Sequence, residues 1–293
     1  MRLPLSLFML ALLTACTQTI HSPAPLHQAF DWISDGTFTQ GVEGPAYHQG
    51  NLYAVNFAKE GTIGVVSEQN QASLYVTLPV GSTGNGIRFN RSNEMFIADY
   101  SGHNVLKVDS QAKVSVYAHQ PTMNQPNDLA IMDNGILFAS DPNWQHSTGK
   151  LWRINLDGST TLLNENMGTT NGIEVSPDNQ TLYVNESVQR RVWAFSLDPH
   201  GNIGPARLFH QFADFGLDGM RTDKQGNLYI ARYGAGEIAV LNPQGQLIRQ
   251  IKLTGQHPTN VAFGGKDGKQ VFVTMQKRGA IETFYNDIAG REF

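Results

Sequence analysis

The chain has 293 residues, of which 40% are hydrophobic and 16% charged, and it contains 29 glycines and a single cysteine. One cysteine excludes a disulfide framework and any metal site built from several thiolates. The net charge of −4, with no run of Lys or Arg, argues against a nucleic-acid partner, which would need a basic stripe. The high glycine content favours tight turns over long helices.

The first residues have the pattern of a secretory leader. An apolar run over 3–13 follows Met1-Arg2, and it is too short to span a bilayer of ~30 Å. The run ends in Leu13-Thr14-Ala15-Cys16, which resembles the lipobox of bacterial lipoproteins, although an ordinary signal peptide with a chance cysteine is the alternative.

We therefore expect a lipoprotein signal peptide over 1–15, lipidation of Cys16 and a polar tether over 16–28. Lipidation anchors a chain to a membrane without inserting it. Thr17, rather than an aspartate, follows the cysteine and resembles the outer-membrane sorting pattern. The expected location is the bacterial cell envelope, at the outer membrane facing the periplasm.

The rest of the chain, 29–293, repeats one block six times. Each block starts with a polar anchor residue and continues with alternating apolar positions, a turn and an aromatic residue. The anchors are Glu43, Asn85, Asn127, Asn171, Asp218 and Asn260, and the aromatic residues are Tyr53, Phe96, Phe138, Tyr183, Tyr229 and Phe272. Two columns that keep the same period of about 44 residues indicate a true internal repeat.

Each repeat is expected to form four short strands, near 172–176, 181–185, 192–197 and 207–211 in the fourth copy. Four strands at this period are typical of a propeller blade, because one such sheet buries its faces only by stacking against neighbours. The sequence thus predicts an all-β, six-bladed β-propeller forming one domain. A strand within 30–38 should close the ring by pairing with the last blade.

The anchors should line one mouth of the central channel, because each stands at the start of the innermost strand of its blade. Two are carboxylates and four are amides, so together they offer hard oxygen ligands suited to Ca²⁺. A single Asn or Asp more often only begins a strand or caps its backbone. Six in register, with two acids facing a common axis, favour a bound cation that relieves the repulsion between the acids.

A second column should return to the same mouth at the end of the second strand and form a pocket wall that selects a ligand. It comprises Asn56, Asp99, Asp141, Glu186, Arg232 and Met275. Solvated loop positions are the alternative for each. His257 lies three residues before Asn260 and is a candidate for proton transfer, although a lone histidine is more often structural.

Several blocks together resemble the SMP-30/gluconolactonase family over about residues 30–285. The blocks are Gly41-Val42-Glu43-Gly44-Pro45, Pro126-Asn127-Asp128, Thr170-Asn171-Gly172-Ile173, Leu217-Asp218-Gly219-Met220 and Pro258-Thr259-Asn260-Val261-Ala262-Phe263-Gly264-Gly265. None is specific alone, but they arrive in family order.

This resemblance implies a divalent cation, usually calcium, held by Glu43, Asn171 and Asp218, with Asn127 as a fourth ligand or a substrate contact. It also implies that Asp218 is the acid/base residue and that the substrate is a small-molecule lactone or related cyclic ester. We expect carbonyl polarisation by the cation and attack of a water assisted by Asp218.

One position departs from the family pattern. Gln125 stands where sugar-lactone hydrolases of the family often carry an arginine, which puts a gluconolactone-like polyol substrate in question. Gln125, Asn127 and Asp141 are the predicted substrate contacts. The alternatives are a calcium-dependent phosphotriesterase-like hydrolase and a non-catalytic envelope propeller that binds a ligand or partner.

Overall fold

The computed structural model describes residues 25–293. The predicted signal peptide, Cys16 and most of the tether lie outside the described residues. Over 25–293 we find no helix that is both long enough and apolar enough to cross a membrane.

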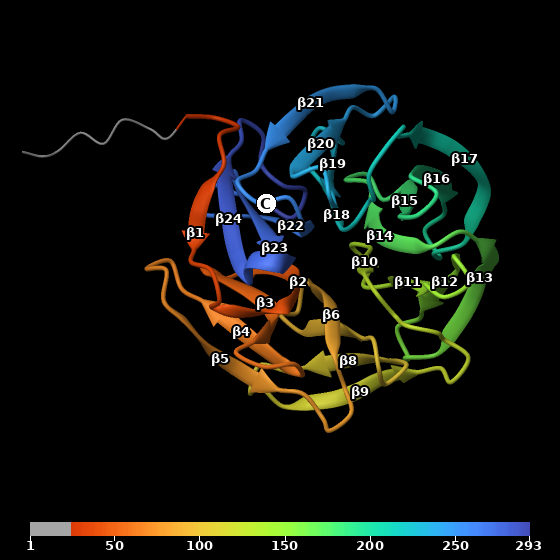
Figure 1. Ribbon diagram of the computed structural model, residues 1–293. Coiled ribbons are helices and arrows are strands. Elements are labelled where there is room, and N and C mark those ends of the chain that lie inside the picture. Colours follow the sequence, from red (N-terminus) through yellow and green to blue (C-terminus); the bar gives the residue numbers. More distant parts are fainter. Residues whose placement is uncertain (1–24) are drawn as a thin grey trace, which may run out of the picture.

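Six four-stranded antiparallel sheets are arranged in a ring around a central axis (Figure 1). The first blade contains β2 Phe38–His48, β3 Asn51–Phe57, β4 Thr62–Val66 and β5 Ala72–Thr77. The second contains β6 Gly84–Phe89, β7 Met95–Asp99, β8 Asn104–Val108 and β9 Val114–His119. The third contains β10 Leu129–Ile131, β11 Leu137–Asn143, β12 Thr148–Ile154 and β13 Thr160–Met167. The fourth blade contains β14 Thr170–Val175, β15 Thr181–Glu186, β16 Arg191–Leu197 and β17 Ile203–Gln211. The fifth contains β18 Met220–Thr222, β19 Leu228–Arg232, β20 Glu237–Leu241 and β21 Leu247–Lys252. The predicted six-bladed propeller is confirmed.

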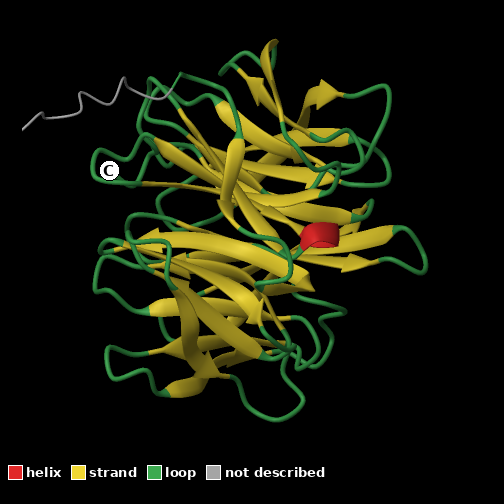
Figure 2. Ribbon diagram, turned by 60° about the vertical axis from the view of Figure 1, so that its left-hand side comes forward, coloured by secondary structure: helices red, strands yellow, loops and turns green. Residues whose placement is uncertain are grey.

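The sixth blade joins the two ends of the described chain. It contains β22 Pro258–Gly264, β23 Gln270–Met275 and β24 Ala280–Tyr285, and its outermost strand is β1 Phe30–Ile33. β1 pairs antiparallel with β24, as expected for the strand within 30–38. Over 25–293 the single helical element is the short 3₁₀ turn η1 Gln276–Arg278 (Figure 2).

Apolar side chains hold each blade against the next one. The buried residues form six clusters, and each cluster combines residues of two neighbouring blades. The aromatic column of the repeat supplies one ring to each cluster; Phe138, for example, packs against β14–β16 of the following blade. Because every blade covers the face of its neighbour, the ring of blades fixes where the inner strands begin.

Candidate active site

Five of the six predicted anchors line one cavity of about 400 Å³ at the axis of the propeller. They are Glu43, Asn85, Asn127, Asn171 and Asp218. The sixth, Asn260, is fully buried, and its side-chain nitrogen lies 3.2 Å from Glu43 Oε1 and 3.2 Å from Asp128 Oδ2. The starts of the inner strands therefore converge on the axis as predicted, with Asn260 supporting Glu43 from within the protein.

The anchors of adjacent blades are tied together through backbone carbonyl groups. Asn85 Nδ2 donates to the carbonyl oxygen of Asn127 at 2.9 Å, and Asn171 Nδ2 lies 3.5 Å from that of Leu217. In the described chain, Asn127 Oδ1 and Asn171 Oδ1 are buried without a hydrogen-bond partner. Since an unsatisfied buried acceptor is costly, these two oxygens favour a ligand that takes lone pairs.

Glu43 is buried and Asp218 is half-buried, and both line this cavity. Burial and the charge of Asp128 raise the pKa of Glu43 to about 7. Burial and the charge of Glu43 raise the pKa of Asp218 well above its usual range. Both effects make it unfavourable for the two groups to be ionised side by side. A cation between them would favour the ionised carboxylates instead.

The residues present fit a divalent cation that prefers hard oxygen ligands. Two carboxylates and two free amide oxygens converge on one cavity, and such a set matches Ca²⁺ better than a soft metal. Within 25–293, no three His, Cys, Asp or Glu side chains gather as a metal-binding group. The fit therefore depends on the amide oxygens of Asn127 and Asn171.

Two glycines next to anchors allow the inner strands to approach this closely. A Cβ on Gly172 would lie 2.3 Å from the backbone oxygen of Asp218, and one on Gly219 would lie 1.8 Å from Asn260 Cγ. The pairing of an anchor with a glycine in the repeat thus results from the contact between neighbouring blades.

The predicted second column does not form the pocket wall, since only Asn56 of its six members lines the cavity. Asp99 accepts hydrogen bonds from Ser82, Thr83, Gly102 and Asn104, and it organises a loop. The other residues are likewise engaged elsewhere. Glu186 accepts from the Gly168 amide, Arg232 pairs with Asp214 and Glu237, and Met275 belongs to an apolar cluster.

Asp141 supports a loop instead of facing the cavity. Its Oδ1 accepts the backbone amides of Asn124 and Gln125, and its Oδ2 accepts the Trp152 indole N–H. With both oxygens engaged and the residue fully buried, Asp141 positions the segment that carries Gln125. Gln125 itself is not among the residues that line the cavity.

The wall is formed by the first residue after the second strand in five blades. These residues are Tyr100, Trp144, Ser187, Tyr233 and Gln276. The prediction from the sequence placed the wall one residue too early in most blades. This error matters because successive side chains of a strand point to opposite faces. The aromatic column would have located four of them, each four residues after its aromatic. Trp144 lies farther along because β11 is longer.

His257 lies beside the wall without lining the cavity. Its ring packs edge-on against Tyr233, with 4.9 Å between ring centroids. This contact gives His257 a supporting role for Tyr233 in the structure.

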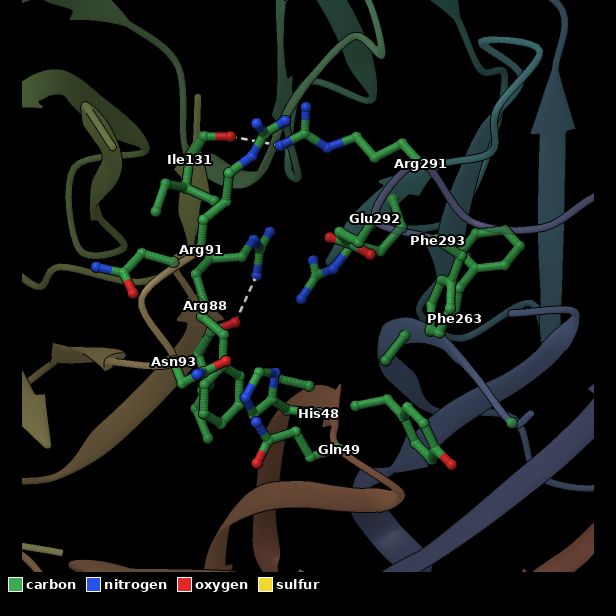
Figure 3. A pocket seen from close by; sticks show the side chains of 18 of the residues that line it. His48, Gln49, Arg88, Arg91, Asn93, Ile131, Phe263, Arg291, Glu292 and Phe293 are labelled. Atoms are coloured by element: carbon green, nitrogen blue, oxygen red, sulfur yellow. Dashed lines mark hydrogen bonds between the residues drawn. The ribbon is translucent and has the colours of Figure 1, made fainter. Parts of the chain in front are cut away.

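A second cavity of about 550 Å³ is lined by residues that include His48, Arg88 and Arg291 (Figure 3). It lies at the opposite end of the inner strands. It shares no lining residue with the first cavity and is bordered by turns between first and second strands, such as 48–50 and 90–93. Arg88 and Arg221 reach it from the buried interior, where they pair with Asp128 and Glu174. These ion pairs form a polar layer within the channel.

Comparison with known sequences shows a match of residues 42–277 to the family description "SMP-30/Gluconolactonase/LRE-like region". A gluconolactonase of Zymomonas mobilis is 31% identical over 65% of this chain and 60% of its own length. A 6-deoxy-6-sulfogluconolactonase of Pseudomonas putida is 28% identical over 46% of this chain and 48% of its own length. The matched part thus spans about half to three fifths of these relatives.

Solved structures of the same fold are similar over nearly the whole chain. A calcium-binding protein, regucalcin, of Agrobacterium tumefaciens has a TM-score of 0.77 at 21% identity, covering 88% of this chain and 94% of its own. A gluconolactonase of Xanthomonas campestris has a TM-score of 0.76 at 20% identity, covering 88% and 89%. At this identity the similarity establishes the propeller fold.

Proposed function

Because this chain belongs to the SMP-30/gluconolactonase/LRE-like family, we propose that it hydrolyses lactones in the cavity at the channel mouth with a bound Ca²⁺ ion. One observation carries this proposal. The carboxyl groups of Glu43 and Asp218 share a cavity with Asn127 and Asn171, whose buried amide oxygens have no hydrogen-bond partner. Relatives with gluconolactonase names support the reaction class.

Glu43, Asn171 and Asp218 would hold the cation, and Asn127 would offer its oxygen to the cation or to the substrate. When bound, the cation supplies a Lewis acid that polarises the lactone carbonyl group. Asn260 keeps Glu43 in position through its side-chain nitrogen.

Asp218 acts on the proton of the attacking water. Its carboxylate oxygen takes this proton while the water oxygen bonds to the carbonyl carbon, and the proton is returned to the alkoxide oxygen when the ring C–O bond breaks. A carboxylate bound to a cation is a weak base, so positioning of water and carbonyl should supply most of the rate gain.

Metal content and hydrolysis, measured together, test the proposal. We expect the purified protein to contain calcium, and we expect EDTA to abolish hydrolysis across a lactone panel and added Ca²⁺ to restore it. An organophosphate panel assayed in parallel distinguishes a phosphotriesterase-like activity. Hydrolysis that is confined to organophosphates, or that is indifferent to EDTA, would refute the proposal.

Two variants separate the roles of the acids. Asp218→Asn keeps an oxygen ligand but cannot carry the proton, so kcat should fall at least a hundredfold with the fold intact. Glu43→Gln removes one ligand charge and should weaken Ca²⁺ binding, measured by calorimetry. An Asp218→Asn enzyme with unchanged turnover would remove Asp218 from the mechanism.

We further propose that the chain is held at the cell envelope by lipidation of Cys16. The support is the lipobox-like segment Leu13-Thr14-Ala15-Cys16 at the end of an apolar run. The polar segment that follows would act as a tether between lipid and propeller.

A further inference from the structure

The lining of the active-site cavity is one-sided in charge. Among residues 25–293, the charged side chains that line it are Glu43, Glu60 and Asp218, and no Lys, Arg or His is among them. A divalent cation offsets two of these acids, Glu43 and Asp218. Glu60 then remains at the exposed rim, where its carboxylate accepts a hydrogen bond from Thr39 Oγ1 at 2.6 Å.

The wall above the acids is neutral and largely aromatic. Tyr100, Trp144 and Tyr233 line it with aromatic side chains, and Ser187 and Gln276 complete the wall. The Tyr233 hydroxyl donates to Gln276 Oε1 at 2.6 Å. Tyr233, Gln276 and Asp218 all line this one cavity.

The chain places basic groups at the other end of the channel instead. Arg88, Arg91, Arg221, Lys266 and Arg291 all line the second cavity. Arg88 and Arg221 are fixed there by Asp128, Glu174 and backbone carbonyl groups. They line a separate cavity, so none of them is available to pair with an anionic substituent of a bound lactone.

On the basis of the proposed lactonase function, we propose that the substrate is an uncharged lactone and that the cavity discriminates against lactones bearing a carboxylate, sulfate or phosphate substituent. Such a substituent would meet the Glu60 carboxylate without a cationic partner, and desolvating it there is unfavourable. The aromatic wall instead offers stacking surfaces and neutral hydrogen-bonding groups to an uncharged ring.

The experiment uses a lactone that the protein hydrolyses, prepared in two forms that differ at one substituent, a carboxylate or its methyl amide. We expect kcat/KM for the amide to exceed that for the carboxylate at least tenfold. Because salt screens repulsion between charges, the carboxylate form should gain activity between 20 and about 300 mM salt, and the amide form should not. Ratios within twofold at low salt would overturn the inference.

Gln276→Arg tests the wall directly, with Gln276→Met as the matched neutral control. The arginine variant should raise the carboxylate-to-amide ratio of kcat/KM at least tenfold, and the methionine variant should leave that ratio as it is. An equal change in both variants would show that shape, not charge, decides, and would refute the inference. If neither form is hydrolysed by the wild-type protein and no lactone of the panel is either, the proposed lactonase function itself fails.

Discussion

The amide anchors show how one residue type serves two purposes in this site. Each side chain can donate through nitrogen and accept through oxygen. Asn85 and Asn171 direct the nitrogen toward a carbonyl of the next blade. In Asn171 this leaves a buried oxygen without a partner. The contact between blades thus orients the oxygen that would bind the proposed cation.

This reasoning predicts different effects for two similar substitutions. Asn171→Ala removes the unpartnered oxygen and should weaken Ca²⁺ binding at least tenfold in calorimetric titration. Asn85→Ala removes a comparable tie between blades but no buried unpartnered oxygen, so its effect on Ca²⁺ affinity should be smaller than threefold. Equal losses in both variants would show that the ties between blades, not the free oxygen, determine affinity.

The anchors could be predicted from the sequence because their period and residue type, and in four of the six a following glycine, are visible there. The pocket wall could not, because its position depends on where each second strand ends. Asp99, the last residue of β7, organises a loop, whereas Tyr100, the next residue, lines the cavity. A shift of one residue reverses the face of a strand. The free oxygens of Asn127 and Asn171 likewise depend on contacts that only the folded chain reveals.

At the scale of the element, the ring is closed by β1, whose attachment depends on a small charged network. Arg278, which ends η1, pairs with Asp31, Asp35 and the buried Glu282 at distances of 2.6–2.8 Å. These ion pairs link β1 to the last blade, in addition to the backbone hydrogen bonds between β1 and β24. A network of this kind stabilises more than an isolated surface pair.

Arg278→Ala should therefore lower the free energy of unfolding by about 1 kcal/mol at pH 7, measured by urea denaturation. Lys277→Ala, at the exposed neighbouring position, is the control and should have little effect.

The hydrogen bond from Arg278 lowers the pKa of Asp31 from 3.8. A group with a lowered folded-state pKa stabilises above its unfolded pKa and loses that contribution as the pH falls through the folded value. The difference between wild type and variant should thus be constant from pH 5 to about 8 and shrink below pH 4. A difference that grows toward acid would contradict this assignment.

At the scale of the whole molecule, the two ends of the channel differ in chemistry. The cavity at one mouth is lined by acids and amides beneath a neutral wall, whereas the separate cavity at the other is lined by five basic and three acidic side chains. The period of the repeat predicted the propeller and its closure, because both depend on local strand patterns. The polar layer of Arg88, Asp128, Glu174 and Arg221 escaped prediction, since these residues come from different repeats and meet only at the axis.

The last prediction concerns where this molecule is held. If Cys16 is lipidated, the protein expressed in a Gram-negative host should partition into the detergent phase of a Triton X-114 extract and sediment with the outer membrane. Cys16→Ala removes the thiol that would receive the lipid, so this variant should not appear in the detergent phase. Mass spectrometry of the N-terminal peptide distinguishes the alternatives, because an ordinary signal peptide leaves an unmodified cysteine or removes it. An unlipidated wild-type protein in the soluble fraction, with lactonase activity intact, would refute the anchor while leaving the active-site proposal standing, since the propeller that carries the site is built from strands within 30–285.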